Sequence, residues 1–322
     1  MSLSADVWTW AWEHWTEVDS RRTEEPVGSD ANGSSAGAVG LDADALDAGV
    51  LGAEVLGMVA ANEADWDARA PLHAASAFYG RPAEYWFADY EWEDLGELRG
   101  RDIVHLQCHL GTETIAFARR GANTTGLDLS AKSLDEARRI AAAADVDVDY
   151  VHANVYDAAG ALGGRQFDVV YTGKGALCYL PDLARWADVV TRLLKPGGFV
   201  YIAEFHPLLN SLRPVSLPGE SEDLVLRNDY LEGRGPIAHD SDVTYTGDVV
   251  PGRQRSYEWM HGLGELVTTL AAAGLRIDVL RESEVLQWPR WPSMVQTPEG
   301  WWRLPDEAPR IPLLFALKAT KI

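Results

Sequence analysis

The sequence predicts a doubly wound α/β domain with a mostly parallel sheet, on two observations. From about residue 100, short apolar runs rich in β-forming residues alternate with helical patterns. The helical patterns stop at Gly121, Gly197 and Gly274, and glycine favours the backbone conformation that ends a helix. Strands that alternate with helices form right-handed crossovers, and the resulting parallel sheet is covered on both faces.

Each element of this domain has its own local signal. The apolar runs that predict strands cover 102–106, 123–127, 148–151, 167–171 and 198–205. The helical patterns between them cover 112–120, 130–144 and 181–194. Ser130 is a favourable N-cap for the second helix. The third helix has an apolar face, which is formed by Leu183, Trp186, Val190 and Leu194.

The strand–helix rhythm is interrupted after the fifth strand. Residues 206–257 form an insertion that is too long for an ordinary connection, and we interpret it as a lid. The rhythm returns with a helix at 264–273, a strand at 275–280 and a last strand at 313–319. We therefore expect one domain over 58–322, with the lid inserted into it.

Residues 1–57 differ in composition from the rest of the chain. They begin with a tryptophan-rich extension that contains Trp8, Trp10, Trp12 and Trp15. Three of these tryptophans are spaced as on one face of a short helix. We expect the extension to cover apolar surface, on its own domain or over the binding site. Residues 27–40, rich in Gly, Ser and Ala, predict a flexible linker.

Composition and charge restrict the classes of partner. The 28 Lys and Arg residues against 49 Asp and Glu residues give a net charge of −21, without a basic patch. Such a surface repels nucleic acids and anionic lipids, and no long apolar run predicts a membrane span. The N-terminus lacks a secretory signal pattern, and two cysteines cannot form a disulfide framework. We expect a cytoplasmic monomer or homodimer that acts on small molecules.

Residues at the ends of three successive strands indicate a nucleoside site, because ligands bind at the carboxyl ends of the strands in an open α/β sheet. Gly111 allows the backbone to approach a ligand closely after the first strand. Asp128 can accept both ribose hydroxyls after the second strand. Asn154 can bond an adenine edge while Val155 packs on its face. The first turn lacks the G-x-G-x-x-G pattern, which argues against NAD and FAD.

The motifs at these positions resemble those of the class I S-adenosylmethionine-dependent methyltransferases. The first motif of that family reads roughly V-L-D-L-G-C-G-T-G, where this chain has I-V-H-L-Q-C-H-L-G at 103–111. The cysteine and the last glycine match, and His105 stands at the acidic position. This H-L-Q-C-H form is similar to one branch of the family. Further motifs agree in order, with G-L-D at 126–128, A-N-V at 153–155, F-D-V-V at 167–170 and L-L-K-P-G-G at 193–198. The resemblance covers about residues 60–322.

The resemblance implies a Rossmann-like sheet and transfer of a methyl group from S-adenosylmethionine to a small-molecule acceptor by in-line displacement. The residues expected to bind this cofactor are Gln107, His109, Gly111, Asp128, Leu129, Asn154, Val155, Thr172 and Tyr79. Acceptor contacts are expected from Tyr179, Glu204 and Trp259. His206 is the candidate general base, because imidazole titrates near neutral pH, and its alternative is a structural role at the strand end.

Several alternatives stay open on the sequence. The altered first motif allows a protein that binds S-adenosylmethionine without catalysing transfer, and an NAD-type oxidoreductase is disfavoured by the missing glycines. No metal site is expected, because His105, Cys108 and His109 lack a second pair of ligands. We expect two or three of six aromatic residues to touch a ligand, out of Tyr79, Trp86, Tyr179, Trp259, Trp301 and Trp302.

Overall fold

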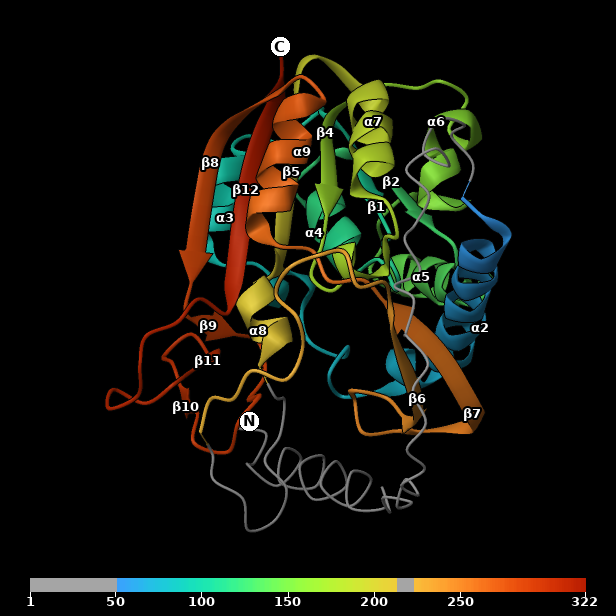
Figure 1. The fold of residues 1–322 in the computed structure, drawn as a ribbon. Coiled ribbons are helices and arrows are strands. Elements are labelled where there is room, and N and C mark those ends of the chain that lie inside the picture. The colour runs from blue at the N-terminus through green and yellow to red at the C-terminus, as the bar shows by residue number, and fades with distance from the viewer. Residues whose placement is uncertain (1–50, 213–222) are drawn as a thin grey trace, which may run out of the picture.

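The computed structural model describes residues 51–212 and 223–322. The tryptophan-rich extension and the expected linker lie outside these described residues. The described part of the chain contains a seven-stranded sheet with helices on both of its faces (Figure 1).

The sheet confirms the doubly wound arrangement. Its strand order is β3-β2-β1-β4-β5-β12-β8. The strands are β1 (Asp102–Leu106), β2 (Asn123–Asp128), β3 (Asp149–His152), β4 (Phe167–Thr172), β5 (Leu194–Phe205), β8 (Leu275–Ser283) and β12 (Leu314–Lys321). The first five are parallel, whereas β12 pairs antiparallel with both β5 and β8. The strand order reverses between β1 and β4, so a ligand site is expected at the carboxyl ends of these two strands.

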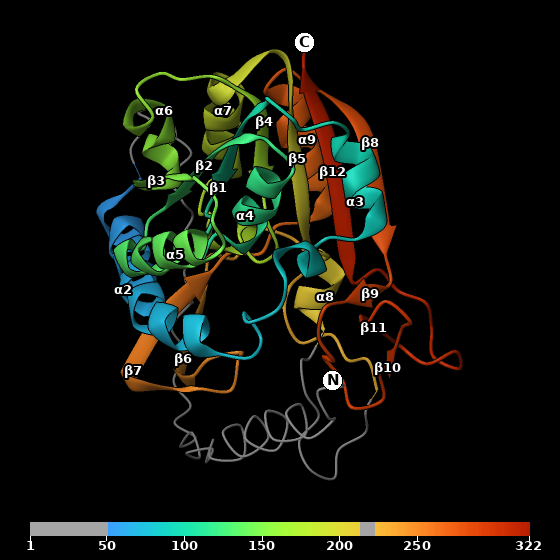
Figure 2. The same ribbon diagram turned by 180° about the vertical axis from the view of Figure 1, so that it is seen from behind.

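The two faces of the sheet are covered by different helices. In Figure 1, α7 (Leu183–Leu193) and α9 (Leu263–Ala272) lie in front of the sheet, and α6 (Ala158–Ala161) lies beside them. The opposite view shows α3 (Asp89–Leu95), α4 (Thr112–Arg119) and α5 (Ala131–Ala143) on the other face (Figure 2). Each face has a hydrophobic core of its own, and Trp186 and Phe117 are among the largest fully buried side chains.

Local signals explain where these helices begin. The Ser130 hydroxyl accepts a hydrogen bond from the backbone N–H of Ser133 at 3.0 Å, so the predicted N-cap of α5 is confirmed. The Asp182 carboxylate caps α7 in the same way, by accepting from the N–H of Arg185 at 2.9 Å. The helix therefore starts two residues later than the apolar pattern suggested.

A long helix and a β-hairpin stand beside the carboxyl ends of the strands. The helix is α2 (Ala53–Ala75), and the hairpin is formed by β6 (Ile237–Val243) and β7 (Val249–Glu258). Both views show the hairpin against α2 (Figures 1 and 2). The Asn62 amide joins them, because it donates to the Tyr257 carbonyl at 2.9 Å and accepts from the Tyr257 N–H at 2.7 Å. Residues 206–257 thus contain an ordered hairpin in the place where the sequence predicted an insertion.

Short elements complete the chain. They are the helix α8 (Pro207–Ser211), the 3₁₀ turns η2 (Ala83–Trp86), η3 (Val155–Asp157) and η4 (Leu177–Tyr179), and the strands β9 (Val285–Leu286), β10 (Val295–Gln296) and β11 (Trp302–Arg303). The last three strands form a small sheet that packs with α8 around Trp291 and Trp301. No helix in the described ranges is long and apolar enough to cross a bilayer.

Candidate functional site

A pocket lies at the carboxyl ends of the central strands, and we call it the strand-end pocket. The empty volume between its walls, including space open to solvent, is about 420 Å³. Its lining residues are Val59, Asn62, Trp66, Gln107, Leu127, Leu129, Asn154, Val155, Tyr156, Tyr179 and Leu180. Gln107, Leu129, Asn154 and Val155 had been predicted as cofactor contacts, and the fold brings these four together. Tyr179, which had been predicted as an acceptor contact, lies in the same pocket.

The turn between β1 and α4 forms one wall of the site and has an unusual backbone. Gln107, His109 and Gly111 all adopt positive φ angles, of 56°, 48° and 68°. Such angles are strained for residues other than glycine and are found mainly at functional sites. Gly111 is required for a second reason, because a Cβ atom at this position would lie 2.3 Å from the hydroxyl oxygen of Tyr150.

Two polar atoms near the ends of β1 and β4 have no hydrogen-bond partner. The Gln107 side chain donates from Nε2 to the Ala176 carbonyl at 3.0 Å, but its buried Oε1 has no partner. The Oγ1 atom of Thr172, a fully buried residue, is also without a partner. Buried polar groups are normally paired, so these two atoms indicate a place for a polar ligand.

Asp128 occupies the expected strand end but is held by the backbone. Its carboxylate accepts hydrogen bonds from the N–H groups of His109 and Ser130, each at 2.8 Å. The residue is 5% exposed, and this burial raises the pKa of Asp128 to about 6. Asp128 does not line the strand-end pocket. Its carboxylate fixes the backbone of the turn that carries His109. Its contact with a ribose stays a prediction.

Asn154 and Val155 are oriented by the start of η3. The amide oxygen of Asn154 accepts from the Tyr156 N–H at 3.0 Å. This bond fixes the side-chain amide at the pocket wall, while Val155 is buried beside it. An amide next to an apolar side chain suits the edge and face of a planar base.

A cluster of imidazole and phenol rings lies beside the pocket. His109 Nε2 lies 2.9 Å from His73 Nδ1, and His109 Nδ1 lies 2.9 Å from the Ser133 hydroxyl. Tyr79 stacks on His73, and its hydroxyl bonds that of Tyr245 from the hairpin. Burial lowers the pKa of His73 to about 2 and that of His109 to about 3, so both rings are neutral at pH 7.

The sequence did not identify His73, Trp66 and Tyr245 as members of this site. His73 is fully buried on α2, and its Nε2 atom has no partner. Trp66, which precedes His73 on α2, lines the pocket. Its ring meets the His109 ring edge-on, with the ring centroids 4.9 Å apart. A signal existed in the spacing of polar residues on α2, because Asn62, Asp65, Arg69 and His73 recur every three or four residues and all are buried.

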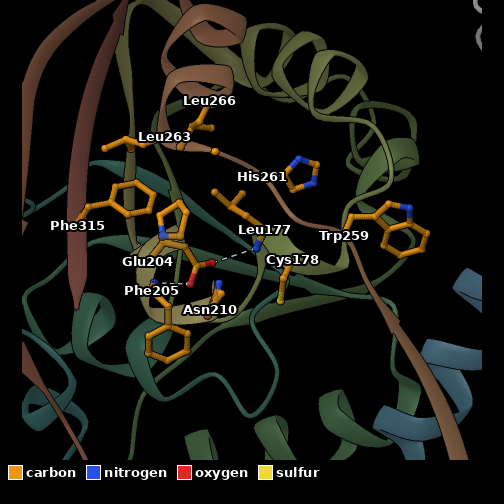
Figure 3. Close-up of a pocket in the computed structure, with 12 residues that line it drawn as sticks. Leu177, Cys178, Glu204, Phe205, Asn210, Trp259, His261, Leu263, Leu266 and Phe315 are labelled. Carbon is orange, nitrogen blue, oxygen red and sulfur yellow. Dashed lines mark hydrogen bonds between the residues drawn. The ribbon is translucent and has the colours of Figure 1, made fainter. Parts of the chain in front are cut away.

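A second pocket lies on the other side of the η4 turn, beneath the start of α9, and we call it the α9 pocket (Figure 3). It is lined by Leu177, Cys178, Glu204, Phe205, Pro207, Asn210, Trp259, His261, Gly262, Leu263, Leu266 and Phe315. Leu177 and Cys178 face this pocket, whereas the next two residues line the strand-end pocket. The η4 turn therefore separates the two spaces. Trp259, predicted as an acceptor contact, lies in the wall of the α9 pocket.

Glu204 also lines the α9 pocket, and the backbone holds its carboxylate. The carboxylate accepts from the N–H groups of Ala176 and Leu177 at 2.8 and 3.0 Å, and from those of Gly175 and Phe205. Figure 3 shows the bond from Leu177. Burial raises the pKa of Glu204, and the four N–H donors act in the opposite direction. All of these bonds are internal, so Glu204 holds the loop after β4, and its contact with an acceptor stays a prediction.

His206 likewise does not have the contacts of a general base. Its Nδ1 accepts from the Leu208 N–H at 3.1 Å, which caps α8, and its Nε2 lies 3.0 Å from a carboxylate oxygen of Glu282. One neutral tautomer satisfies both contacts, and the residue is 4% exposed. His206 lines neither pocket, so we assign it the structural role that the sequence had left as the alternative.

The remaining aromatic candidates divide between the site and the core. Tyr79 belongs to the ring cluster, and Trp86 packs against it with ring centroids 5.7 Å apart. Trp302 lies in β11 of the small sheet, and Trp301 directly precedes it and donates from its indole to the Tyr85 carbonyl at 3.2 Å. These two tryptophans line neither pocket. In the described ranges no three His, Cys, Asp or Glu side chains are grouped so that they could hold a metal ion.

The middle of the chain is similar to known methyltransferases. The family model for a methyltransferase domain matches residues 104–200. The ubiquinone biosynthesis O-methyltransferase of Klebsiella pneumoniae is 29% identical over 193 residues, which cover 52% of this chain and 77% of that protein. The protein of the same name from Alkalilimnicola ehrlichii is 39% identical over 112 residues, which cover 35% of this chain and only 44% of that protein.

Solved structures agree on the fold. An S-adenosylmethionine-dependent methyltransferase from Listeria monocytogenes superposes with a TM-score of 0.52 at 20% identity, over 72% of this chain and 96% of that one. The DhpI protein in complex with S-adenosylhomocysteine gives a TM-score of 0.50 at 17% identity, over 82% of this chain and 97% of that one. At these identities the likeness concerns the fold alone. Nothing in these comparisons favours an oxidoreductase or a protein without catalysis.

Proposed function

Because this chain belongs to the class I S-adenosylmethionine-dependent methyltransferases, we propose that it methylates an oxygen atom of a small, largely apolar molecule. The chain is an enzyme with S-adenosylmethionine as its cofactor. The oxygen acceptor is our proposal, and it is supported by the relatives that are named O-methyltransferases. Those relatives match about half of this chain or less, so their own substrate is not transferred to it.

The composition of the strand-end pocket is the observation that carries the proposal. The unpartnered Oε1 of Gln107 offers an acceptor, the Asn154 amide suits a base edge, and Leu129 is apolar. Gln107, Leu129 and Asn154 follow the ends of β1, β2 and β3, which are neighbours in the sheet. Ligands of open α/β sheets bind at such carboxyl ends. The residues present therefore fit the nucleoside part of the cofactor.

The protein contributes mainly position and shielding to the reaction. When bound, S-adenosylmethionine supplies a methyl carbon that its sulfonium group activates for displacement. Asn154 and Val155 would hold the base, and the free Oε1 of Gln107 would accept a hydrogen bond from the bound cofactor. Tyr79, Tyr245 and Trp66 exclude water with their rings, which also favour a nearby cation.

We place the acceptor on the far side of η4, with the α9 pocket as the start of its site. The lining is mostly apolar, with Leu177, Phe205, Leu263 and Leu266 in its walls (Figure 3). Such a lining selects an apolar body and leaves the reactive oxygen to point toward the cofactor. The short η4 turn then lies between cofactor and acceptor, and its movement would join the two pockets.

We further propose that the β6–β7 hairpin is a lid. The hairpin follows β5 and α8 in the chain and packs on α2. It places Tyr245 against Tyr79 and His73. This position supports the proposal. The hairpin contacts α2, which lines the strand-end pocket, and the ring cluster beside it, so a movement of the hairpin could open or close the pocket. The part assigned to the tryptophan-rich extension lies outside the described residues.

A transfer assay with methyl-labelled S-adenosylmethionine tests the proposed acceptor. The purified chain is incubated with matched sets of small aromatic alcohols, amines and thiols, and both labelled product and S-adenosylhomocysteine are measured. We expect turnover with members of the hydroxyl set and slower or absent turnover with the other two. Turnover confined to amines or thiols would refute the oxygen acceptor and leave the enzyme class intact.

A further inference from the structure

The first motif of this chain lacks a negative charge at the position where its family carries an acid. His105 stands there, 2% exposed, with its Nδ1 2.9 Å from the Thr114 hydroxyl. Burial lowers the pKa of His105 to about 4, so its ring is neutral at pH 7. S-adenosylmethionine carries an α-ammonium group, an α-carboxylate and a sulfonium, and an ammonium group is bound best where a carboxylate of the protein faces it.

Glu113 brings a carboxylate to the same place from α4. A Cβ atom built on Gly173 would lie 3.3 Å from His105 Nε2 and 3.4 Å from Glu113 Oε1. Both atoms therefore border the space over Gly173, which follows directly on the end of β4. The other oxygen of Glu113 accepts from the Thr112 hydroxyl at 2.6 Å. This bond leaves Oε1 as the oxygen that faces Gly173.

The neighbouring buried cations are already paired with other acids. Lys174 lies 3.1 Å from both oxygens of Glu91 and donates to the Trp86 carbonyl at 2.8 Å. Arg69 pairs with Asp65 at 2.9 Å on α2. Within the described ranges no Lys, Arg or His pairs with Glu113, although it lies close enough to Tyr79, Tyr171 and Tyr245 to raise their pKa values.

A further feature points to a ligand near this carboxylate. The buried Oε1 of Gln107, which follows β1 beside β4, has no hydrogen-bond partner. Glu113 also lies in the first turn of α4, where the helix dipole stabilises a carboxylate without a cationic partner.

We propose that Glu113 pairs with the α-ammonium group of S-adenosylmethionine and takes over the part of the acid that His105 replaces. The inference rests on the proposed strand-end pocket, since the nucleoside must lie there for the amino-acid end to reach the space over Gly173. In this arrangement Gln107 supplies a neutral polar contact of the same region. In this chain the carboxylate stands at the start of α4 instead of at the end of β1.

Calorimetric titration with two ligands tests this role. S-adenosylhomocysteine carries the ammonium group, whereas 5′-methylthioadenosine has the same thio-nucleoside without the amino-acid end. We expect Glu113→Gln to weaken S-adenosylhomocysteine about tenfold or more, the effect of losing a charged hydrogen-bond acceptor. Binding of 5′-methylthioadenosine should stay within about twofold of the wild-type value, because it makes no contact with Glu113. Glu113→Asp, which keeps the charge on a shorter side chain, should restore part of the lost affinity.

The control is Asp89→Asn, which removes an exposed carboxylate from the first turn of α3 and should change neither affinity. Equal weakening of both ligands by Glu113→Gln would show that Glu113 shapes the pocket and would overturn the inference. Unchanged binding of S-adenosylhomocysteine would overturn it as well. Failure of the wild-type protein to bind either ligand would instead refute the proposed pocket. Thermal unfolding of each variant separates these outcomes from loss of the fold.

Discussion

Lowering the pH from 7 to 5 should weaken the binding of S-adenosylhomocysteine through one carboxyl group, Asp128. This prediction combines the expected ribose contact of Asp128 with its burial. The ionised carboxylate accepts from two backbone N–H groups and can accept ribose hydroxyls as well. The protonated form offers fewer acceptor sites and must place a proton beside these N–H donors.

The size of the effect follows from the pKa of Asp128, which burial raises to about 6 in the unliganded protein. If the ionised form alone binds, the affinity is proportional to its fraction, which is about 90% at pH 7 and about 10% at pH 5. The affinity therefore falls about tenfold between these values. Binding lowers the pKa, so about half a proton should be released for each ligand bound near pH 6.

Calorimetry in buffers of different ionisation enthalpy measures both the affinity and the released proton. The control is Asp128→Asn, which has one amide oxygen for two N–H donors and no group that titrates in this range. The variant should bind about tenfold more weakly at pH 7 and lose the pH dependence. His73, His105 and His109 do not interfere, because burial lowers their pKa values to about 2, 4 and 3.

Two results would refute the reasoning. Wild-type affinity that stays constant from pH 7 to pH 5 would show that Asp128 either keeps a low pKa or does not contact the cofactor. A pH dependence that persists in Asp128→Asn would assign the titration to another group.

Three further predictions concern the residues around the site. Glu204→Gln should lower the free energy of unfolding by about 2–4 kcal/mol in urea, because the amide cannot accept from all four N–H groups that the carboxylate holds. His206→Ala should cost about 1 kcal/mol through the lost cap of α8 and keep kcat within about tenfold, whereas a hundredfold loss with unchanged stability would restore the general-base hypothesis. Tyr245→Phe should raise hydrogen exchange in 237–258 in the presence of S-adenosylhomocysteine, since it removes the contact with the Tyr79 hydroxyl, and unchanged exchange would argue against the lid.

The sequence predicted the sheet and the position of the strand-end pocket because both depend on local patterns. Strand periodicity and glycine stops are short-range signals, and the carboxyl ends of parallel strands necessarily meet at one edge. Gln107, Leu129, Asn154 and Val155 were therefore brought together as expected. The parallel pattern does not extend to the last strand, β12, whose antiparallel direction depends on the connection that precedes it.

The contacts of Glu204 with the loop after β4 and of His206 with Glu282 could not be predicted, because these partners are distant in the chain. The structural role of His206 was the alternative that the sequence left open, and its cap to Leu208 is local. Both residues stand at a strand end, where a catalytic group is expected. Glu204 is bonded by a loop nearly thirty residues earlier, and His206 meets Glu282, more than seventy residues later. The sequence predicts that a residue stands at a strand end. The role of the residue depends on the hydrogen bonds that its side chain makes in the fold.

The members of the site that the sequence missed reach it from outside the sheet. His73 arrives from α2 and Tyr245 from the hairpin, so their approach depends on how these elements pack. His109 was identified only through its motif, and its pairing with His73 gives a structural reason for an imidazole in place of glycine.

The most direct test of the central claim is a calorimetric titration of the full chain with S-adenosylhomocysteine and, separately, with NAD. The claim is that the strand-end pocket holds the adenosine of S-adenosylmethionine. We expect binding of S-adenosylhomocysteine that weakens when Asn154 is changed to Ala, and no measurable binding of NAD. Tighter binding of NAD than of S-adenosylhomocysteine, or equal binding of S-adenosylhomocysteine by Asn154→Ala, would contradict the account.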